Sequence, residues 1–350
     1  MTTSEASDPP SAGAFGFDVR PAWRRDDPQI EADAIEFWTR LGLLPKIVAP
    51  EERAKELLAA AYKDGRLVAV STAKIEHVDF LNARFAVIRG ATDPDYRRGN
   101  AQLALAQASR RAMHEWARAN PGEKYAGAIA FVDRKEWGDF ARLPVWPESE
   151  LQFVGYDKRG RQVRIRWFED FYFGDGPSPL PLPAVTYELP PGVEMRVAWR
   201  RNDLEIERDA IGFWQRLGNL PTDTAPEERA KEVVLAAYHE GRLVGVTTAE
   251  VGIVPQVRAR LAMLRGSVDP AYRRTGIGLA MYPRALDALE EWAAANPDEA
   301  VKGVGGIIEA PELADLQRVP YWPQVRNGLI GFTPDGRQIR VRWFRDVLLD

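Results

Sequence analysis

In the second half of the chain, apolar residues recur at mixed spacings of three and four positions. Between Asp203 and Leu217 they are Ile206, Ala210, Ile211, Phe213, Trp214 and Leu217. This spacing places them on one face of a helix, and Gly218 is typical of a helix end. Pro226, followed by two glutamates, is typical of the first turn of a second helix. We expect this second helix to continue to about Tyr238.

Runs of apolar residues predict the strands of the same half. They are expected at Met195–Trp199, Arg242–Val251, Val257–Val268, Gly303–Ile308, Leu329–Phe332 and Arg337–Phe344. The last two flank Thr333-Pro334-Asp335-Gly336, which is a hairpin signal. A long helix is expected from about Gly276 to Asn296, where Pro297 follows. The pattern predicts an α+β fold class, with a mixed β-sheet flanked by helices.

The first half repeats this pattern, because a shift of 176 positions (199 − 23) aligns the chain with itself without a gap. The segment Trp23-Arg24-Arg25 falls on Trp199-Arg200-Arg201. The segment from Ala49 to Glu56 matches that from Ala225 to Glu232 residue for residue. Such self-similarity is the signature of an internal duplication. The sequence therefore predicts two tandem domains of the same fold.

The domain boundaries follow from the repeat and from the proline content between its copies. We expect a disordered tail over 1–17, a first domain over 18–173, a linker over 174–192 and a second domain over 193–350. The linker holds alternating prolines, which favour a stiff, extended polyproline-type spacer. The tail has neither the basic start nor the apolar core of a signal peptide.

Composition narrows the classes of function. The formal net charge is -4, whereas binding to nucleic acid or to anionic membranes calls for a basic surface. No apolar run is long enough to span a bilayer. The chain has no cysteine, which excludes disulfides and thiolate ligands, and its three histidines are scattered. We therefore expect a cytoplasmic protein with no metal site, no membrane partner and no nucleic-acid partner.

One segment of the second half stands out for its chemistry. It runs Asp269-Pro270-Ala271-Tyr272-Arg273-Arg274-Thr275-Gly276-Ile277-Gly278, between a predicted strand and the longest predicted helix. Glycines at such a junction let backbone N–H groups approach an anion, with the helix dipole behind them. A tight turn without any ligand is the alternative. The spacing fits neither the dinucleotide fingerprint nor the P-loop.

The stretch Arg273-Arg274-Thr275-Gly276-Ile277-Gly278 resembles the Arg/Gln-x-x-Gly-x-Gly/Ala signature of the GNAT acyltransferases, which bind acyl-CoA. The exit from the preceding strand, Val268-Asp269-Pro270-Ala271-Tyr272, is also similar to that family. The predicted order of elements matches the family fold in both halves. The tandem layout is similar to that of duplicated GNAT enzymes such as mycothiol synthase, although nothing in the sequence identifies that substrate.

The resemblance implies acetyl-CoA, or another acyl-CoA, as co-substrate. The loop residues Arg273, Arg274, Thr275, Gly276, Ile277 and Gly278 would hold the pyrophosphate. The preceding strand would pair with the pantetheine arm through Leu264, Gly266 and Val268, and would offer an N–H near the thioester oxygen. An amine would then attack the thioester directly, without a covalent acyl-enzyme.

The resemblance also implies an acid for the leaving thiolate and a base for the ammonium. Tyr321 lies close to the place of the family's acid, and an aromatic packing residue is the alternative. Glu309, at a strand end, is the candidate base, acting through a water, and a solvated carboxylate is the alternative. Tyr282 is interpreted as a packing residue or a neighbour of the pantetheine. The arginines at 337, 340 and 342, with partners at 161, 164 and 166, suggest a solvated face.

The first half departs from the pattern at the same places. Asn100 and Gln102 replace the two loop glycines, and Val145 replaces Tyr321. Side chains then stand where the backbone should approach the pyrophosphate. We therefore interpret the first half as a domain that keeps the fold and has lost catalysis. The sequence leaves open whether it retains weak CoA binding through Gly99.

The leading hypothesis is an acetyl-CoA-dependent N-acetyltransferase, active in the second half, that acts on a small-molecule or peptide amine. A longer acyl group, a non-catalytic acyl-CoA-binding or regulatory protein, and a purely structural protein are the alternatives. The glycine pair argues against the last of these. The acceptor is not readable from the sequence, nor is the choice between a monomer and a homodimer.

Overall fold

The computed structural model describes residues 15–44, 48–97, 100–147, 149–184, 187–219, 225–309 and 313–350. Most of the expected disordered tail, 1–14, lies outside the described residues, as does Gly99. Phe17, which we assigned to the tail, is buried in a core cluster of the first half together with Ala59, Val68 and Leu105. The first domain therefore begins before residue 18.

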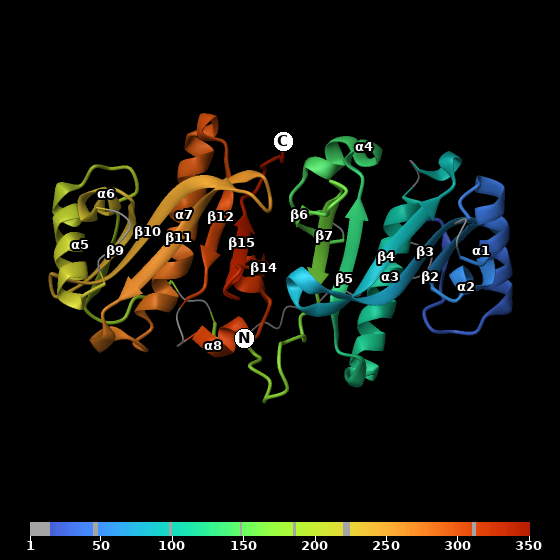
Figure 1. Ribbon diagram of the computed structural model, residues 1–350, viewed down its shortest axis with the longest axis horizontal. Coiled ribbons are helices and arrows are strands. Elements are labelled where there is room, and N and C mark those ends of the chain that lie inside the picture. The colour runs from blue at the N-terminus through green and yellow to red at the C-terminus, as the bar shows by residue number, and fades with distance from the viewer. Residues whose placement is uncertain are drawn as a thin grey trace. The chain divides into compact units, whose positions relative to one another are not determined.

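The second half contains a sheet with helices on both of its faces (Figure 1). Its elements are β8 (Val193–Val197), α5 (Leu204–Leu217), α6 (Pro226–Ala230), β9 (Val233–His239), β10 (Arg242–Val254), β11 (Ala259–Val268), η5 (Pro270–Tyr272), α7 (Ile277–Ala295), η6 (Pro297–Glu299), β12 (Val301–Ile307), α8 (Ala314–Gln317), β13 (Tyr321–Trp322), η8 (Pro323–Val325), β14 (Asn327–Phe332) and β15 (Gln338–Trp343).

The first half follows the same order. Its elements are β1 (Asp18–Pro21), α1 (Pro28–Leu41), α2 (Pro50–Ala54), β2 (Leu57–Lys63), β3 (Arg66–Val78), η1 (Asp79–Leu81), β4 (Ala83–Thr92), η2 (Pro94–Tyr96), α3 (Ala101–Ala119), η3 (Pro121–Glu123), β5 (Tyr125–Val132), α4 (Arg134–Trp137), η4 (Gly138–Arg142), β6 (Gln152–Tyr156) and β7 (Gln162–Trp167). In place of β13 it has a single bridge between Val145 and Gln152.

Each half forms its own mixed sheet, which confirms the predicted α+β class. The strand order is β13-β14-β15-β12-β11-β10-β9-β8 in the second half and β1-β2-β3-β4-β5-β7-β6 in the first. Neighbouring strands are antiparallel except for β11 with β12 and β4 with β5, which are parallel. Each parallel pair is joined through a long helix, α7 or α3, as parallel strands require a crossover.

Local sequence signals explain the ends of α5. The carboxylate of Asp203 accepts hydrogen bonds from the N–H groups of Glu205 and Ile206. Such a cap satisfies amides that have no partner within the helix. At the other end Gly218 adopts the left-handed conformation with φ 65°. Both signals recur in α1, at Asp27 and Gly42, so the two halves build this helix in the same way.

The second helix predicted after Pro226 is much shorter than expected, and this prediction was wrong. It ends at Ala230, and the run Val233–His239 is a strand, β9. Six of the seven residues of β9 are buried, because helices cover both faces of the sheet there. A strand buried on both faces reads as a continuous apolar run, and such a run cannot be distinguished from a helix by periodicity.

The predicted solvated face of arginines was wrong for Arg340, Arg342 and Arg164, whereas Arg337 is exposed as expected. Arg340 is fully buried, Arg342 is nearly so, and Arg164 of the first half is fully buried as well. The Arg340 guanidinium lies over the Trp322 ring at 4.0 Å and donates to Gln338 at 3.0 Å. Stacking on an aromatic face and hydrogen bonding compensate for the loss of water.

The chain divides into two compact units that do not coincide with the two halves. The first unit is Met1–Asp133, Val145–Phe153 and Arg161–Phe171, and the second is Arg134–Pro144, Val154–Gly160 and Tyr172–Asp350. The predicted linker thus belongs to the unit that contains the second half. Arg318 donates to the carbonyls of Phe173 and Pro177, at 2.9 and 2.8 Å, and so fastens the start of the linker to that unit.

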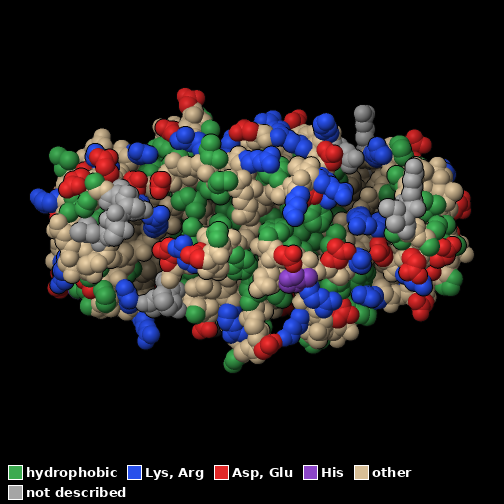
Figure 2. Space-filling view, in the orientation of Figure 1, with side chains coloured by type: hydrophobic (Ala, Val, Ile, Leu, Met, Phe, Trp, Pro, Cys, Tyr) green, Lys and Arg blue, Asp and Glu red, His purple; other side chains and the backbone are tan. Residues whose placement is uncertain are grey.

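Side chains of both charges lie interspersed on the face shown in Figure 2. None of the helices in the described part of the chain combines the length and apolar character that a membrane crossing needs. Within the same described ranges, His, Asp and Glu side chains form no group of three placed to hold a metal ion.

Candidate functional site

The glycine-containing loop lies where strand β11 ends and helix α7 begins. Asp269 caps the short turn η5 by accepting from the N–H of Ala271 at 3.0 Å. Its buried carboxylate also lies 3.7 Å from Arg216 and 3.5 Å from Arg242. The hydroxyl of Thr275 donates to the Tyr272 carbonyl at 2.7 Å. The loop is therefore held to the sheet at its start and folded back on itself before the helix.

Gly276 is the residue at which the loop turns into the helix. It has φ 91° and ψ -7°, a conformation that residues with a side chain rarely adopt. A Cβ at this position would meet no atom within 4 Å, so the space beside the backbone is open. Gly278 has ordinary helical geometry, and the nearest atom to a Cβ there is Val268 Cγ2 at 3.9 Å. Gly276 therefore provides both the positive φ and open space beside the backbone. Gly278 provides only the open space through which a ligand can approach the backbone.

The backbone amides of this loop have no acceptors of their own. Among the described residues, no side chain or carbonyl accepts from the N–H groups of 274–278, and the N-cap has no side-chain hydrogen bond. Amides at the start of a helix carry a partial positive charge and bind anions. The exposed side chains of Arg273 and Arg274 add positive charge beside them. The loop is therefore suited to a phosphate or pyrophosphate group.

Strands β11 and β12 are paired along only part of their length. Their last paired residues are Met263 and Gly305. Beyond this point β12 continues with β15, through Gly306 and Ile307, while β11 continues with β10 up to Val268. The two parallel strands thus separate, and we call this point the fork.

Leu264, Gly266 and Val268 present their backbone groups to the open edge of β11. The N–H of Asp269 donates to a β10 carbonyl at 2.8 Å, and backbone groups alternate between the two edges of a strand. The backbone N–H and C=O groups of Val268, Gly266 and Leu264 therefore point away from β10. A Cβ added to Gly306 of β12 would lie 3.5 Å from the Leu264 carbonyl oxygen. This oxygen therefore points toward β12 and away from β10, as the alternation requires. The three predicted strand residues share the edge beyond the fork and lead directly into the loop.

Tyr321 lies level with the fork. Tyr321 of β13 pairs with Gly328 of β14, and Gly328 pairs with Val341 of β15. Val341 in turn pairs with Gly305 of β12, the residue at the fork. Its neighbour Trp322 packs into the core beneath α7. Because successive side chains of a strand point to opposite faces, Tyr321 projects from the face that does not carry α7. Tyr321 thus shares the row of the fork, but β14 and β15 lie between β13 and β12, so about 14 Å of sheet separate it from Gly305.

Glu309 lies away from the fork. It follows β12 four residues after Gly305, about 13 Å along an extended chain. Its side chain is 61% exposed and forms an ion pair with Arg337 of β15. The structure therefore does not bring Glu309 together with Tyr321, and its role as base stays a prediction.

Two groups near this site were given no catalytic role from the sequence, although Tyr282 was interpreted as a packing residue or a neighbour of the pantetheine. The hydroxyl of Tyr282, on α7, accepts from the side-chain amide of Asn327 at 2.9 Å. Glu232, after α6, accepts from Arg229 at 2.8 Å, and burial raises the pKa of its carboxyl. Glu232 belongs to the segment repeated exactly in both halves, so the comparison between halves could not reveal it. Tyr282 and Asn327 differ between the halves, and that difference is the signal that could have found them.

The first half keeps the turn before the loop and the conformation at the start of the helix, whereas Arg97 (ψ -27°) differs in backbone from its counterpart Arg273 (ψ 148°). Asn100, which replaces Gly276, adopts φ 62° and ψ 4°, close to the glycine's conformation. Asparagine tolerates this region better than most residues. Gln102, which replaces Gly278, is exposed on the first turn of α3. Asp93 is held by Arg40 at 2.6 Å and by Arg66 at 3.3 Å, as its counterpart is in the second half. The contacts of Asp93 and the conformation at the start of the helix are thus preserved where the glycines are not.

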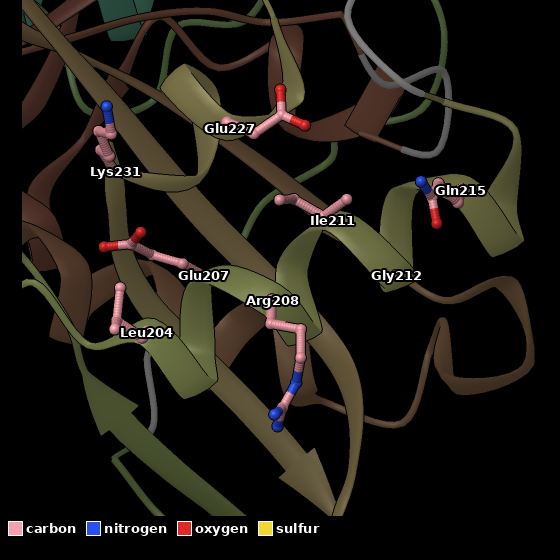
Figure 3. Close-up of a pocket in the computed structure, with 8 residues that line it drawn as sticks. All are labelled: Leu204, Glu207, Arg208, Ile211, Gly212, Gln215, Glu227 and Lys231. Atoms are coloured by element: carbon pink, nitrogen blue, oxygen red, sulfur yellow. The ribbon is translucent and has the colours of Figure 1, made fainter.

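A separate hollow of about 410 Å³ lies between α5 and α6 (Figure 3). It is lined by Leu204, Glu207, Arg208, Ile211, Gly212, Gln215, Glu227 and Lys231. None of the predicted site residues lines it. The hollow is therefore distinct from the loop and the fork.

Comparisons with known proteins give matches among solved structures only. No family model and no curated protein matches the chain. The chain is similar to a GNAT-family acetyltransferase from Streptococcus pneumoniae, with 14% identity and a TM-score of 0.30 over 43% of this chain and 99% of that one. It is similar to the ribosomal-protein-S18-alanine N-acetyltransferase from Escherichia coli, with 17% identity and a TM-score of 0.28 over 43% and 90%. It is also similar to AtaTR bound with AcCoA, with 12% identity and a TM-score of 0.31 over 43% and 94%. We base the function proposed below on the geometry of the second half.

Proposed function

We propose that the second half is an acyl-CoA-dependent N-acyltransferase, acting as an acetyltransferase, and that the first half is a related domain without an intact cofactor loop. One observation carries the proposal. The open edge of β11 ends at Val268, and the amides of 274–278, which have no acceptor among the described residues, follow after the turn 269–273. An extended arm and a pyrophosphate at its end, joined as in CoA, fit this track of N–H groups, which the turn interrupts.

The track has two parts that suit two parts of the same ligand. The N–H groups around Gly276 and Gly278, with Arg273 and Arg274 beside them, would hold the pyrophosphate. The edge formed by Leu264, Gly266 and Val268 would pair with the amides of the pantetheine arm. A strand edge offers such pairing to any extended chain that carries amides. The open space at Gly276 is the place where a side chain would block this approach.

When bound, acyl-CoA supplies a thioester whose carbonyl carbon an amine can attack. The β11 edge at the fork offers an N–H to the thioester oxygen, where negative charge develops. A bond forms between the amine nitrogen and the carbonyl carbon, and the C–S bond breaks with its electron pair on sulfur. Two protons leave the ammonium nitrogen; one reaches sulfur and the other goes to solvent. No residue of the chain becomes acylated in this scheme.

We propose Tyr321 as the acid that returns a proton to sulfur, because it lies close to the place of the acid in the GNAT acyltransferases that the sequence resembles. Glu309, two residues beyond the end of β12, is proposed as the base that takes a proton from the ammonium; because about 13 Å of extended chain separate it from the fork, it would act through water. The carboxylate of Glu309 forms an ion pair with Arg337. Val145 replaces the phenol in the first half, which agrees with a single active half.

The acceptor proposed is a small-molecule or peptide amine, and the acidic net charge favours neither nucleic acid nor an anionic membrane as partner. A cytoplasmic location follows from the supply of acyl-CoA. The fused halves form either a monomer or a homodimer. Attack on the thioester requires a neutral amine, so a primary amine with a lowered pKa is the acceptor that such a site would turn over most readily.

Calorimetric titration of the full chain with acetyl-CoA and CoA tests this function. We expect one site per chain, lost when Gly278 is replaced by Gln, the residue of the first half. A panel of amines, followed by detection of released thiol, then identifies the acceptor class. Absence of CoA binding in the unmodified protein would refute the function, and two equal sites would refute the asymmetry between the halves.

A further inference from the structure

A methionine of β11 lies across a glycine of β12 at the fork. Met263 and Gly305 are the last paired residues of these two strands. A Cβ added to Gly305 would lie 2.5 Å from the Met263 Sδ atom and 3.2 Å from its Cε atom. Packed atoms do not approach so closely, so the end of the Met263 side chain occupies space that only a glycine leaves free. The side chain therefore crosses from β11 to β12 in the row at which the two strands separate.

Met263 lies on the face of the sheet opposite α7. Its neighbours Ala262 and Leu264 belong to the core cluster that α7 covers, and successive side chains of a strand point to opposite faces. Val304, which precedes Gly305, belongs to the same cluster. In the described part of the chain, the core cluster beneath α5 contains no residue of β11 or β12. Helix α5 therefore packs beside the fork, and the side chain of Met263 stays half-buried there.

The proposed path of acyl-CoA leads the acyl group onto this face. An arm that follows the open edge of β11 from Val268 toward Leu264 reaches the fork with its sulfur end. Straight ahead, within the sheet, the pairing of β11 with β12 closes the gap. On one face the core beneath α7 fills the space, where Leu264 and Ile277 are both buried. The acyl group beyond the sulfur therefore turns toward the other face, where Met263 lies at the closed end of the gap.

The first half has a stiffer arrangement at the same place. The residues aligned with Met263 and Gly305 are Val87 and Ile129, and Ile129 is fully buried. These two residues also end the pairing of the parallel strands β4 and β5. Both are β-branched and restricted in their rotamers, whereas methionine has three rotatable bonds and adapts to the space around it. A movable side chain over a glycine is thus a property of the half that has the open loop.

Resting on the function proposed above, we infer that Met263 sets the length of the acyl group that the second half accepts. With its side chain over Gly305, the closed end of the fork has room for a short acyl group such as acetyl. A longer linear chain enters only by displacing the Met263 Sδ and Cε atoms from their place over the glycine. The co-substrate is thus a short, unbranched acyl-CoA, and Met263 is a specificity-determining residue.

The surroundings of Gly305 favour a hydrocarbon chain once Met263 is out of the way. The Leu261 Cδ1 atom would lie 3.5 Å from the same added Cβ, and Leu261 is fully buried. On its other side Met263 pairs with Glu250 of β10, which is exposed, so the apolar direction leads over the glycine. Burial of one methylene group raises affinity by a factor of about four. The two methylenes that distinguish butyryl from acetyl therefore give about a tenfold gain wherever this space is free.

The test measures affinity along a series from acetyl-CoA through butyryl-CoA to hexanoyl-CoA, by calorimetry on the full chain. The variants are Met263→Ala, which empties the space, and Met195→Ala as the matched control. Met195 is a half-buried methionine of β8, three strands from β11 in the same sheet. We expect the unmodified protein and the control to bind butyryl-CoA no more tightly than acetyl-CoA. In Met263→Ala we expect butyryl-CoA to gain about tenfold over acetyl-CoA.

Two outcomes overturn the inference: an unchanged preference between the two compounds in Met263→Ala, and tighter binding of hexanoyl-CoA than of acetyl-CoA by the unmodified protein. Binding of no acyl-CoA by the unmodified protein overturns the proposed function itself. If Met263→Ala does not fold, Met263→Val gives the second test, because valine favours strands and stands at the aligned position of the first half. Valine is shorter than methionine, so this variant should gain part of the preference for butyryl-CoA. No gain in Met263→Val would then overturn the role of Met263.

Discussion

The side-chain amide of Asn327 donates to the hydroxyl of Tyr282 at 2.9 Å, joining the start of β14 to the second turn of α7. No such bond is possible in the first half, where Ala106 and Leu151 stand at these positions. The two halves share their strands, helix caps and buried arginines. They differ at this pair, at the loop glycines and at Tyr321. Among the many differences between the halves, those at the glycines and at Tyr321 lie at residues of the proposed site.

Replacing Gly278 by Gln should remove CoA binding without unfolding the protein. The position is helical, and the nearest atom to an added Cβ is 3.9 Å away, so the side chain fits the fold. Gln also favours a helix over Gly by up to about 1 kcal/mol. Calorimetry should show loss of the CoA site, while thermal unfolding is unchanged or slightly raised. The control is Gln102→Gly in the first half, which should create no second site while Asn100 remains.

Replacing Gly276 should affect the fold of the loop itself. Its φ of 91° costs an alanine about 1 kcal/mol or more, whereas Asn is better tolerated and is present at the first-half position. We expect Gly276→Ala to lower the unfolding temperature more than Gly276→Asn does. Equal effects of the two variants on thermal unfolding would contradict the role assigned to this conformation. Both should weaken CoA binding, because both put a side chain into the open space.

The two proposed proton-transfer residues should separate turnover from binding. Tyr321→Phe should lower the turnover number by about tenfold or more and leave CoA affinity nearly unchanged, because the phenol acts only after the bond to sulfur breaks. Glu309→Gln should lower turnover most at low pH, where the amine is fully protonated and depends on a base. Steady-state kinetics with an acceptor from the amine panel measures both. Unaltered turnover in either variant assigns the role to another group, with Glu232 the next base to test.

The first half should show a pH dependence that originates at Asp93. The hydrogen bond from Arg40 holds the pKa of the Asp93 carboxyl below its usual range. A carboxyl whose pKa is lowered on folding stabilises the fold above its unfolded pKa, near 3.9, and loses this effect as the pH falls through the folded value. Asp93→Asn should therefore lower the unfolding temperature at neutral pH. The difference from the unmodified protein should shrink below about pH 4, and a constant difference would contradict this origin.

Removing Arg318 should release the start of the linker. Its guanidinium donates to the carbonyl of Phe173, just before the linker, and to those of Gly176 and Pro177 within it, and lies over the Tyr172 ring at 5.1 Å. In Arg318→Ala, hydrogen exchange and proteolysis over 173–177 should increase, since these bonds hold a segment without secondary structure. The control is Lys231→Ala, an exposed lysine that bonds only to Glu228 on its own helix. Equal exchange in both variants would show that the linker is held by other contacts.

The sequence by itself determined the duplication, the class of fold and the position of the loop. The repeat needs no structure to be seen, and the helix caps at Asp203 and Gly218 act within a few residues. The junction at Gly276 was readable for the same reason, because a positive φ and free amides are local properties of a glycine before a helix. Signals that act over a short stretch of chain survive in the sequence alone.

Tertiary structure decided what depends on neighbours distant in sequence. Strand β9 looked like a helix because both of its faces are covered by helices from elsewhere in the chain. Arg340 looked solvated because alternation along a strand does not reveal which aromatic ring stacks on its guanidinium. Strand pairing determines the fork, the row in which Tyr321 lies and the distance of Glu309 from the fork. Helix packing on the sheet determines the bond between Tyr282 and Asn327. These contacts join residues tens of positions apart, and only the folded chain brings them together.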